Sequence, residues 1–168
     1  TLHFLGTPVV YTPWLEFPLS GERKSGFLTP ILGSSVSRGF EFASPYYLNL
    51  APDYDATLVP RFMTKRGLQL GGQFRYLRPE EAGEINGALL YDDRVTGTDR
   101  YAISWKHNQN IPQVAGLAGY WNLNKVSDDT YFTDLSDSVA YTSQVSLPRE
   151  AGLAWAKGPY SLLARVQA

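Results

Sequence analysis

The stretch that decides the fold covers residues 26–55 and reads GFLTPILGSSVSRGFEFASPYYLNLAPDYD. It predicts a hairpin of two strands, each about ten residues long, joined by a turn at residues 34–39. Each strand carries a proline in its middle, Pro30 in the first and Pro45 in the second. Proline has no N–H to give to a ladder, so it is normally confined to sheet edges and bulges. The two prolines therefore predict a seam at which the sheet is weakly paired.

Beyond this hairpin, apolar and polar side chains alternate with a period of two residues, the pattern of strands that have one apolar face. In the clearest case the apolar Leu68, Leu70, Phe74 and Tyr76 alternate with the polar Gln69, Gln73 and Arg75. Further strands are predicted at residues 55–63, 84–91, 100–107, 114–123, 138–147, 153–156 and 160–166. The chain thus predicts about ten strands and no convincing helix.

The connections between these strands differ in length. Residues 92–99 and 124–137 form long polar loops two strands apart, so they are expected on the same side of the sheet. Short turns on one side and longer loops on the other are typical of outer-membrane barrels, and Tyr and Trp at strand ends suit their aromatic girdles. The predicted fold class is all-β: part of an antiparallel up-and-down outer-membrane β-barrel. A soluble β-sandwich shows the same alternation and remains the alternative.

Composition narrows the classes of function. The 168 residues have a net charge of −1, which excludes a global basic field for nucleic acid. The absence of Cys excludes disulfides, thiolate metal sites and cysteine nucleophiles within this chain. No apolar run approaches the length of a transmembrane helix. The chain begins with Thr1 and ends within a predicted strand, so we interpret it as a fragment of a longer protein.

No group of residues predicts catalysis or a metal site, so we expect no enzyme and no cofactor. His3 and His107 stand alone, and Ser104 lies in no nucleophile-elbow motif. The loop acids lack the spacing of an EF-hand: Asp92, Asp93, Asp128, Asp129, Asp134 and Asp137. We expect these carboxylates to be solvated, with weak binding of divalent cations as the alternative.

Several segments resemble the family of the LPS-assembly protein LptD. They are residues 11–18 (YTPWLEFP), 23–30 (RKSGFLTP), 45–57 (PYYLNLAPDYDAT), 66–67 (RG) and 74–77 (FRYL). Residues 125–128, with Tyr131, Phe132 and Asp134, also fit that family. The resemblance covers nearly the whole chain, is densest over residues 11–77 and weakens after residue 137.

The resemblance implies an outer-membrane protein of a Gram-negative bacterium that inserts lipopolysaccharide into the outer leaflet. Residues 1–24 would be the end of a periplasmic β-jellyroll or its hinge, and residues 25–168 the N-terminal portion of a barrel. Pro30 and Pro45 match the two prolines of the family's lateral gate. The implied partners are lipopolysaccharide, outer-membrane lipids, the lipoprotein plug LptE and the periplasmic bridge protein LptA. The alternatives are a generic porin fragment and a soluble carbohydrate-binding module.

Two basic pairs are candidates for contact with the lipid. Arg23-Lys24 and Lys65-Arg66 are most simply interpreted as solvated turn charges. Their functional interpretation is contact with phosphates of lipid A or of the inner core, because Arg and Lys are the usual phosphate-binding side chains. If the first strand runs outward, Lys65 and Arg66 lie at the cell surface and Arg23 and Lys24 on the periplasmic side.

Overall fold

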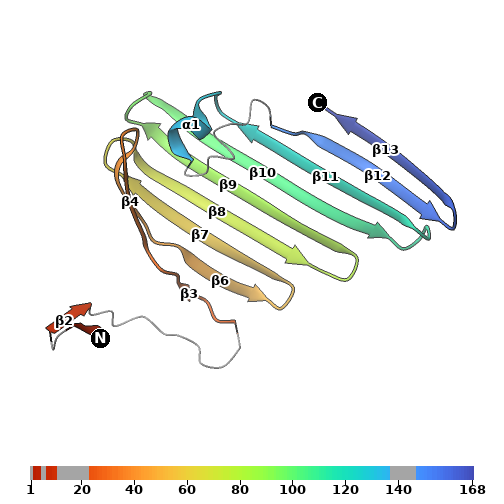
Figure 1. The fold of residues 1–168 in the computed structure, drawn as a ribbon, viewed down its shortest axis with the longest axis horizontal. Coiled ribbons are helices and arrows are strands. Elements are labelled where there is room, and N and C mark those ends of the chain that lie inside the picture. Colours follow the sequence, from red (N-terminus) through yellow and green to blue (C-terminus); the bar gives the residue numbers. More distant parts are fainter. Residues whose placement is uncertain (1, 5–6, 11–22, 137–146) are drawn as a thin grey trace.

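The structure is a computed structural model that describes residues 2–4, 7–10, 23–136 and 147–168. Strands β3 to β13 form one 11-stranded antiparallel sheet (Figure 1), and β1 (Leu2–Phe4) and β2 (Thr7–Val10) form a separate two-stranded sheet. From β7 to β13 each strand pairs with the next one in the chain, and in the first hairpin β3 pairs with β6 and β4 with β5. The prediction of an all-β, antiparallel, up-and-down fold is confirmed.

The strands lengthen from the first hairpin toward the middle of the sheet. Their bounds are β3 Gly26–Phe27, β4 Ile31–Ser35, β5 Gly39–Ala43, β6 Tyr46–Ala51, β7 Tyr54–Met63, β8 Gly67–Leu77, β9 Glu81–Asp93, β10 Thr98–Ile111, β11 Leu117–Val126, β12 Glu150–Lys157 and β13 Tyr160–Gln167. Within the described residues, β13 is one edge of the sheet, and β3 and β4 together form the other. The sheet is therefore open, as expected for part of a barrel wall.

One face of the sheet is apolar and open to its surroundings. Strand pairing places Ala56, Phe74, Ile85, Trp105 and Leu123 in one row across five strands. On the same face, large side chains are 46–56% exposed at Leu58, Leu68, Leu70, Leu89 and Ile103. A soluble sheet would cover such a face, whereas a barrel wall presents it to lipid. The alternation predicted from the sequence is confirmed for β8.

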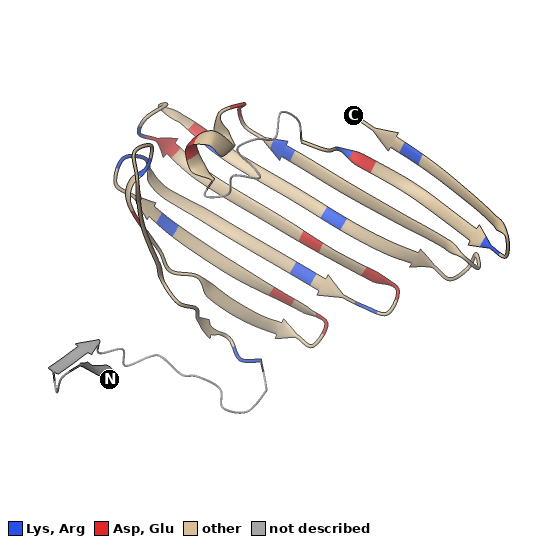
Figure 2. Cartoon of the chain, viewed as in Figure 1, with Lys and Arg blue, Asp and Glu red and all other residues tan. Residues whose placement is uncertain are grey.

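The opposite face is polar. One row of paired residues runs Asp55, Arg75, Glu84, Lys106, Asn122 and Glu150, from β7 to β12. Figure 2 shows acidic and basic residues spread over several strands of the sheet. Because opposite charges neighbour one another along this row, the polar face carries charge without a single-sign field.

The turns fall on two sides of the sheet. The end that we name the long-loop end contains residues 36–38, 64–66, 94–97 and 127–136. The opposite short-turn end contains residues 52–53, 78–80, 112–116 and 158–159. The prediction that the loops after β9 and β11 lie on the same side is confirmed.

A short helix, α1 (Tyr131–Leu135), lies within the loop that follows β11. The sequence predicts no convincing helix, and the five residues of α1 are too few to produce a helical period. Tyr131 and Leu135 are 5% and 3% exposed and pack with Met63 and Leu90 on the polar face. Tertiary packing thus stabilises α1. No helix of the described residues is long and apolar enough to cross a membrane.

The region after α1 differs from the predicted strand order. The strand predicted at residues 138–147 lies almost wholly outside the described residues. The strand that pairs with β11 is β12, in the register Leu117 to Trp155 through Asn122 to Glu150. The up-and-down pattern predicted residues 138–147 as the neighbour of β11, and in the structure this neighbour is β12.

Candidate functional site

The first hairpin is paired in two separate pieces. Near the short-turn end β3 pairs with β6, and near the long-loop end β4 pairs with β5. Residues 28–30 and 44–45 lie between these pieces, and Pro30 and Pro45 fall inside this interruption. The N–H of Leu28 donates a 2.8 Å hydrogen bond to the carbonyl of Pro45. The two continuous ten-residue strands predicted here are therefore wrong, because each strand breaks at its proline.

A third proline, Pro60 of β7, lies opposite the same interruption. β7 pairs with β6 as far as Leu58 and with β5 from Arg61 onward. The N–H of Ser44 donates a 3.1 Å hydrogen bond to the carbonyl of Pro60. In an antiparallel ladder the N–H and C=O of one residue point to the same neighbour, so the donor that Pro60 lacks would also face the interruption.

Alternation along β7 puts Pro60 on the apolar face with Leu58 and does not reveal its place at the seam. The equal spacing of Pro30, Pro45 and Pro60 was the available signal. We name the segment of residues 28–30, 44–45 and 59–60 the proline seam.

The outer edge of this hairpin is apolar. Within the described residues, β4 pairs only with β5 and β3 only with β6, so their other sides are free. Phe27, Ile31 and Leu32 are 61%, 58% and 67% exposed. An exposed strand edge with unpaired backbone groups is a site for pairing with a further strand.

The β4–β5 half is tied to β7 by a buried carboxylate. Glu41 is 7% exposed and accepts hydrogen bonds of 3.1 and 3.2 Å from the Nε and Nη2 of Arg38. It also forms an ion pair with Arg61 of β7. Charge-assisted bonds of this kind are stronger than neutral ones, so this half of the hairpin has support that does not depend on backbone pairing.

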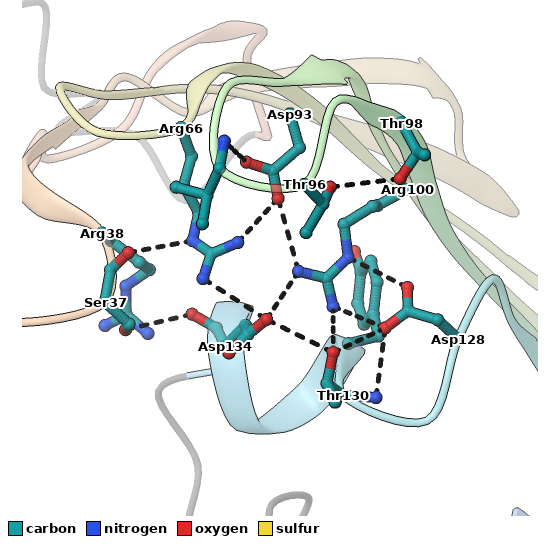
Figure 3. A network of polar contacts seen from close by, with 12 residues as sticks. Ser37, Arg38, Arg66, Asp93, Thr96, Thr98, Arg100, Asp128, Thr130 and Asp134 are labelled. Carbon is teal, nitrogen blue, oxygen red and sulfur yellow. Dashed lines mark hydrogen bonds and ion pairs between the residues drawn. The ribbon is translucent and has the colours of Figure 1, made fainter.

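At the long-loop end, five charged residues form what we name the outer network: Arg66, Asp93, Arg100, Asp128 and Asp134 (Figure 3). Arg66 is 3% exposed, and its Nη1 lies 2.6 Å from the Oδ2 of Asp93 and its Nη2 3.3 Å from that of Asp134. Arg100 is 1% exposed and bonds Asp93, Asp128 and Asp134. The outer network contains two cations and three carboxylates, so each buried charge has partners of opposite sign.

The outer network sets the ionisation of Asp128, which lies in the loop after β11. Burial alone would raise its pKa, but hydrogen bonds from Arg100, Ser127 and Thr130 outweigh burial and hold the pKa at about 2. The two nitrogens of Arg100 lie 2.9 and 2.6 Å from its carboxylate oxygens. Asp128 is therefore charged at neutral pH.

The prediction of solvated loop acids is wrong for Asp93, which is 0% exposed. Its partners Arg66 and Arg100 come from the turn before β8 and from β10. Because Arg66 lies 27 residues away in the sequence, local spacing gave no signal of the pair. Arg100 lies on the polar face of β10, and the alternation of this strand does not reveal its partners.

The two predicted basic pairs lie at opposite ends of the sheet. Arg23 is at the short-turn end, where its side chain is 63% exposed and its Nη1 lies 3.7 Å from the Oδ2 of Asp55. Lys24 is exposed beside it. Lys65 is exposed at the long-loop end and donates to the carbonyl of Val36, whereas Arg66 is buried in the outer network. Contact of these four residues with lipopolysaccharide stays a prediction.

A hollow of about 940 Å³ lies on the polar face. It is lined by polar strand residues, among them Gln73, Asn86 and Lys106, and by Tyr131 and Leu135 of α1. Among the described residues, no group of three or more His, Cys, Asp or Glu side chains is placed to hold a metal ion. The lining also includes Ala88, Ala102 and Phe132, so the hollow offers both polar and apolar surface.

The apolar outer face, the polar hollow and the interrupted first hairpin define a segment of an outer-membrane-type barrel wall. A family model described as LptD, LPS transport system D, matches residues 98–168. The LPS-assembly protein LptD of Paraburkholderia xenovorans is 52% identical over 99% of this chain and 21% of its own length. The LPS-assembly protein LptD of Azoarcus sp. is 48% identical over 95% of this chain and 19% of its own length.

These similarities show that the chain belongs to the LptD family. The chain spans about a fifth of the length of these curated relatives.

Proposed function

We propose that this chain is the first part of an outer-membrane barrel that delivers lipopolysaccharide to the outer leaflet through the proline seam. The observation that carries this proposal is the interruption of both strands of the first hairpin at Pro30 and Pro45, opposite Pro60. Membership of the LptD family supports the substrate, because its relatives are named for LPS assembly.

The location follows from the two faces of the sheet. The apolar face would meet the lipids of the outer membrane, and the polar face would line the barrel interior. Residues 25–168 form the barrel part of this proposal, and residues 1–24 would lead into it from a periplasmic domain. The long-loop end would then lie at the cell surface.

Weak pairing gives the seam its role. Each ladder bond that a proline removes forfeits a net of about 0.5–1.5 kcal/mol. Backbone groups without partners are costly within a bilayer, so a barrel opens where the fewest bonds must break. The edge formed by β3 and β4 is the place where the first strand would pair with the last strand of the whole barrel. Opening there would let an amphipathic lipid pass sideways into the membrane.

The partners that we propose are those that the resemblance to the LptD family implies. The polar hollow would receive a plug such as the lipoprotein LptE, and a bridge protein such as LptA would dock on the domain before residue 25. Arg23 and Lys24 at the short-turn end are exposed and would meet phosphates of an arriving lipid, Arg23 in exchange for its 3.7 Å pair with Asp55. Lys65 would meet them at the surface, whereas Arg66 would first have to leave Asp93 and Asp134.

The test is depletion and replacement of the natural full-length protein in its own cells. Depletion should stop newly made lipopolysaccharide from reaching the cell surface while it continues to be synthesised, and replacement should restore delivery. A generic porin would instead leave delivery intact and alter the uptake of small solutes. That result would overturn the proposal.

A further inference from the structure

Helix α1 contacts the first hairpin directly. The carbonyl of Asp134 accepts a 3.3 Å hydrogen bond from the Oγ of Ser37, and the carbonyl of Ser136 accepts one of 3.0 Å from Arg38. Ser37 and Arg38 form the turn between β4 and β5. These bonds therefore join two segments that are almost a hundred residues apart.

The outer network joins the same two segments a second time. The Nε of Arg66 donates a 2.9 Å hydrogen bond to the carbonyl of Ser37, while its Nη2 pairs with the carboxylate of Asp134. Arg100 holds that carboxylate from the other side at 2.8 Å. Asp134 is thus fixed by two buried cations, and its backbone supports the hairpin turn (Figure 3).

The proline seam divides the first hairpin into a β4–β5 half and a β3–β6 half, and these bonds reach only one of them. Those from α1 and the outer network reach the β4–β5 half, and none of those described for α1 reaches β3 or β6. Arg61 of β7, whose Nε donates to Glu41, donates from its Nη1 to the carbonyl of Leu135 at 3.1 Å. Among the described residues, α1 therefore supports the β4–β5 half of the hairpin and makes no hydrogen bond to the β3–β6 half.

We propose that α1 is an internal latch that holds the β4–β5 half of the hairpin against the sheet. The latch regulates the seam, so it rests on the proposed function. Swinging this half outward must break the bonds of Ser37 and Arg38 to α1. Because Asp134 bonds both Arg66 and Arg100, a shift of α1 weakens the whole set together.

The latch also links the seam to the barrel interior. Tyr131, Phe132 and Leu135 of α1 line the polar hollow. A molecule that displaces α1 from the hollow lowers the cost of opening the hairpin, and one that packs on α1 raises it. The two states differ in defined contacts, as a population shift requires.

The test is hydrogen exchange of the full-length protein in lipid nanodiscs, followed by mass spectrometry. Asp134→Asn weakens the pairs with Arg66 and Arg100. We expect amides of residues 31–43 to exchange roughly tenfold faster, the factor that one lost charge-assisted bond implies. Residues 46–51 and β8 should not change. Glu81→Gln, which weakens an ion pair with Arg78 at the short-turn end, is the control and should leave the hairpin unchanged.

A milder variant guards against misfolding of Asp134→Asn. Ser37→Ala removes only the hydroxyl that bonds Asp134, and should speed exchange of residues 31–43 by roughly threefold. Faster exchange confined to residues 94–97 and 127–136 would mean that the outer network holds only the loops, and would overturn the latch. Because the measurement needs no lipopolysaccharide, the latch and the proposed function can fail separately.

Discussion

The ring of Tyr76 in β8 lies across Gly83 of β9, its direct partner in the ladder. A Cβ at position 83 would lie 2.2 Å from the hydroxyl of Tyr76 and 2.8 Å from the carbonyl of Lys106. The space above the glycine lets the Tyr76 hydroxyl reach the Nδ1 of His107 at 2.5 Å. The contact of Tyr76 with His107, which stacks on Trp121, thus depends on the absence of a side chain at position 83.

Gly83→Ala should therefore destabilise the protein by about 1–3 kcal/mol, the usual range for overpacking. Gly87→Ala on the same strand is the matched control, because its nearest neighbour would be an ordinary 4.0 Å away. The measurement is urea unfolding of the full-length protein in detergent. Equal stability of the two variants would contradict the packing of Tyr76 over Gly83.

The two faces of β8 give a second prediction. Leu70→Arg places a charge on the apolar face and should cost roughly 2–4 kcal/mol if it lies near the middle of the membrane. Gln73→Arg places the same charge on the polar face, where Gln73 already bonds Asn86, and should cost much less. Folding yield in outer membranes and unfolding in detergent measure both. Equal tolerance at the two positions would exclude a barrel wall.

The third prediction concerns the side of the membrane on which each end of the sheet lies. Small accessibility tags inserted at Gly97 and at Asp129, both at the long-loop end, should be labelled on intact cells. A tag at Gly158 in the short-turn end is the control and should be labelled only after the outer membrane is opened. Labelling at only one of the first two positions would be incompatible with the topology.

The depressed pKa of Asp128 gives a fourth prediction. Its folded value of about 2 lies below its ordinary value of 3.8, so its stabilising effect is fully present above about pH 4. That effect is lost as pH falls toward 2, because the carboxylate then binds a proton in the folded state. Asp128→Asn should lower the melting temperature at pH 7, and the difference should shrink between pH 4 and pH 2. A difference independent of pH would show that charge is not the cause.

Local pattern was sufficient for the two faces of a regular strand and insufficient for the contacts between loops. The alternation around Leu70 and Gln73 predicted both faces of β8, because a period of two residues is a property of the strand itself. The roles of Asp93 and Arg66 could not be predicted, because their pairing depends on which turns the sheet brings together. Helix α1 was missed for the same reason, since its packing on Met63 and Leu90 stabilises it.

At the proline seam, one feature could be predicted from the sequence and another could not. Pro30 and Pro45 predicted weak pairing from the sequence alone, since a missing N–H is a property of the residue. That both strands would break completely, with Pro60 aligned beside them, depended on the register of β5, β6 and β7.

The measurement that tests the central claim most directly is delivery of lipopolysaccharide by the double variant Pro30→Ala, Pro45→Ala in the intact protein. Restored N–H groups should strengthen the seam and slow the arrival of newly made lipopolysaccharide at the cell surface, at matched barrel abundance. Pro13→Ala, outside the predicted barrel, is the control and should not slow it. Unchanged delivery and unchanged outer-membrane permeability in the double variant would contradict the claim that lipid leaves through this seam.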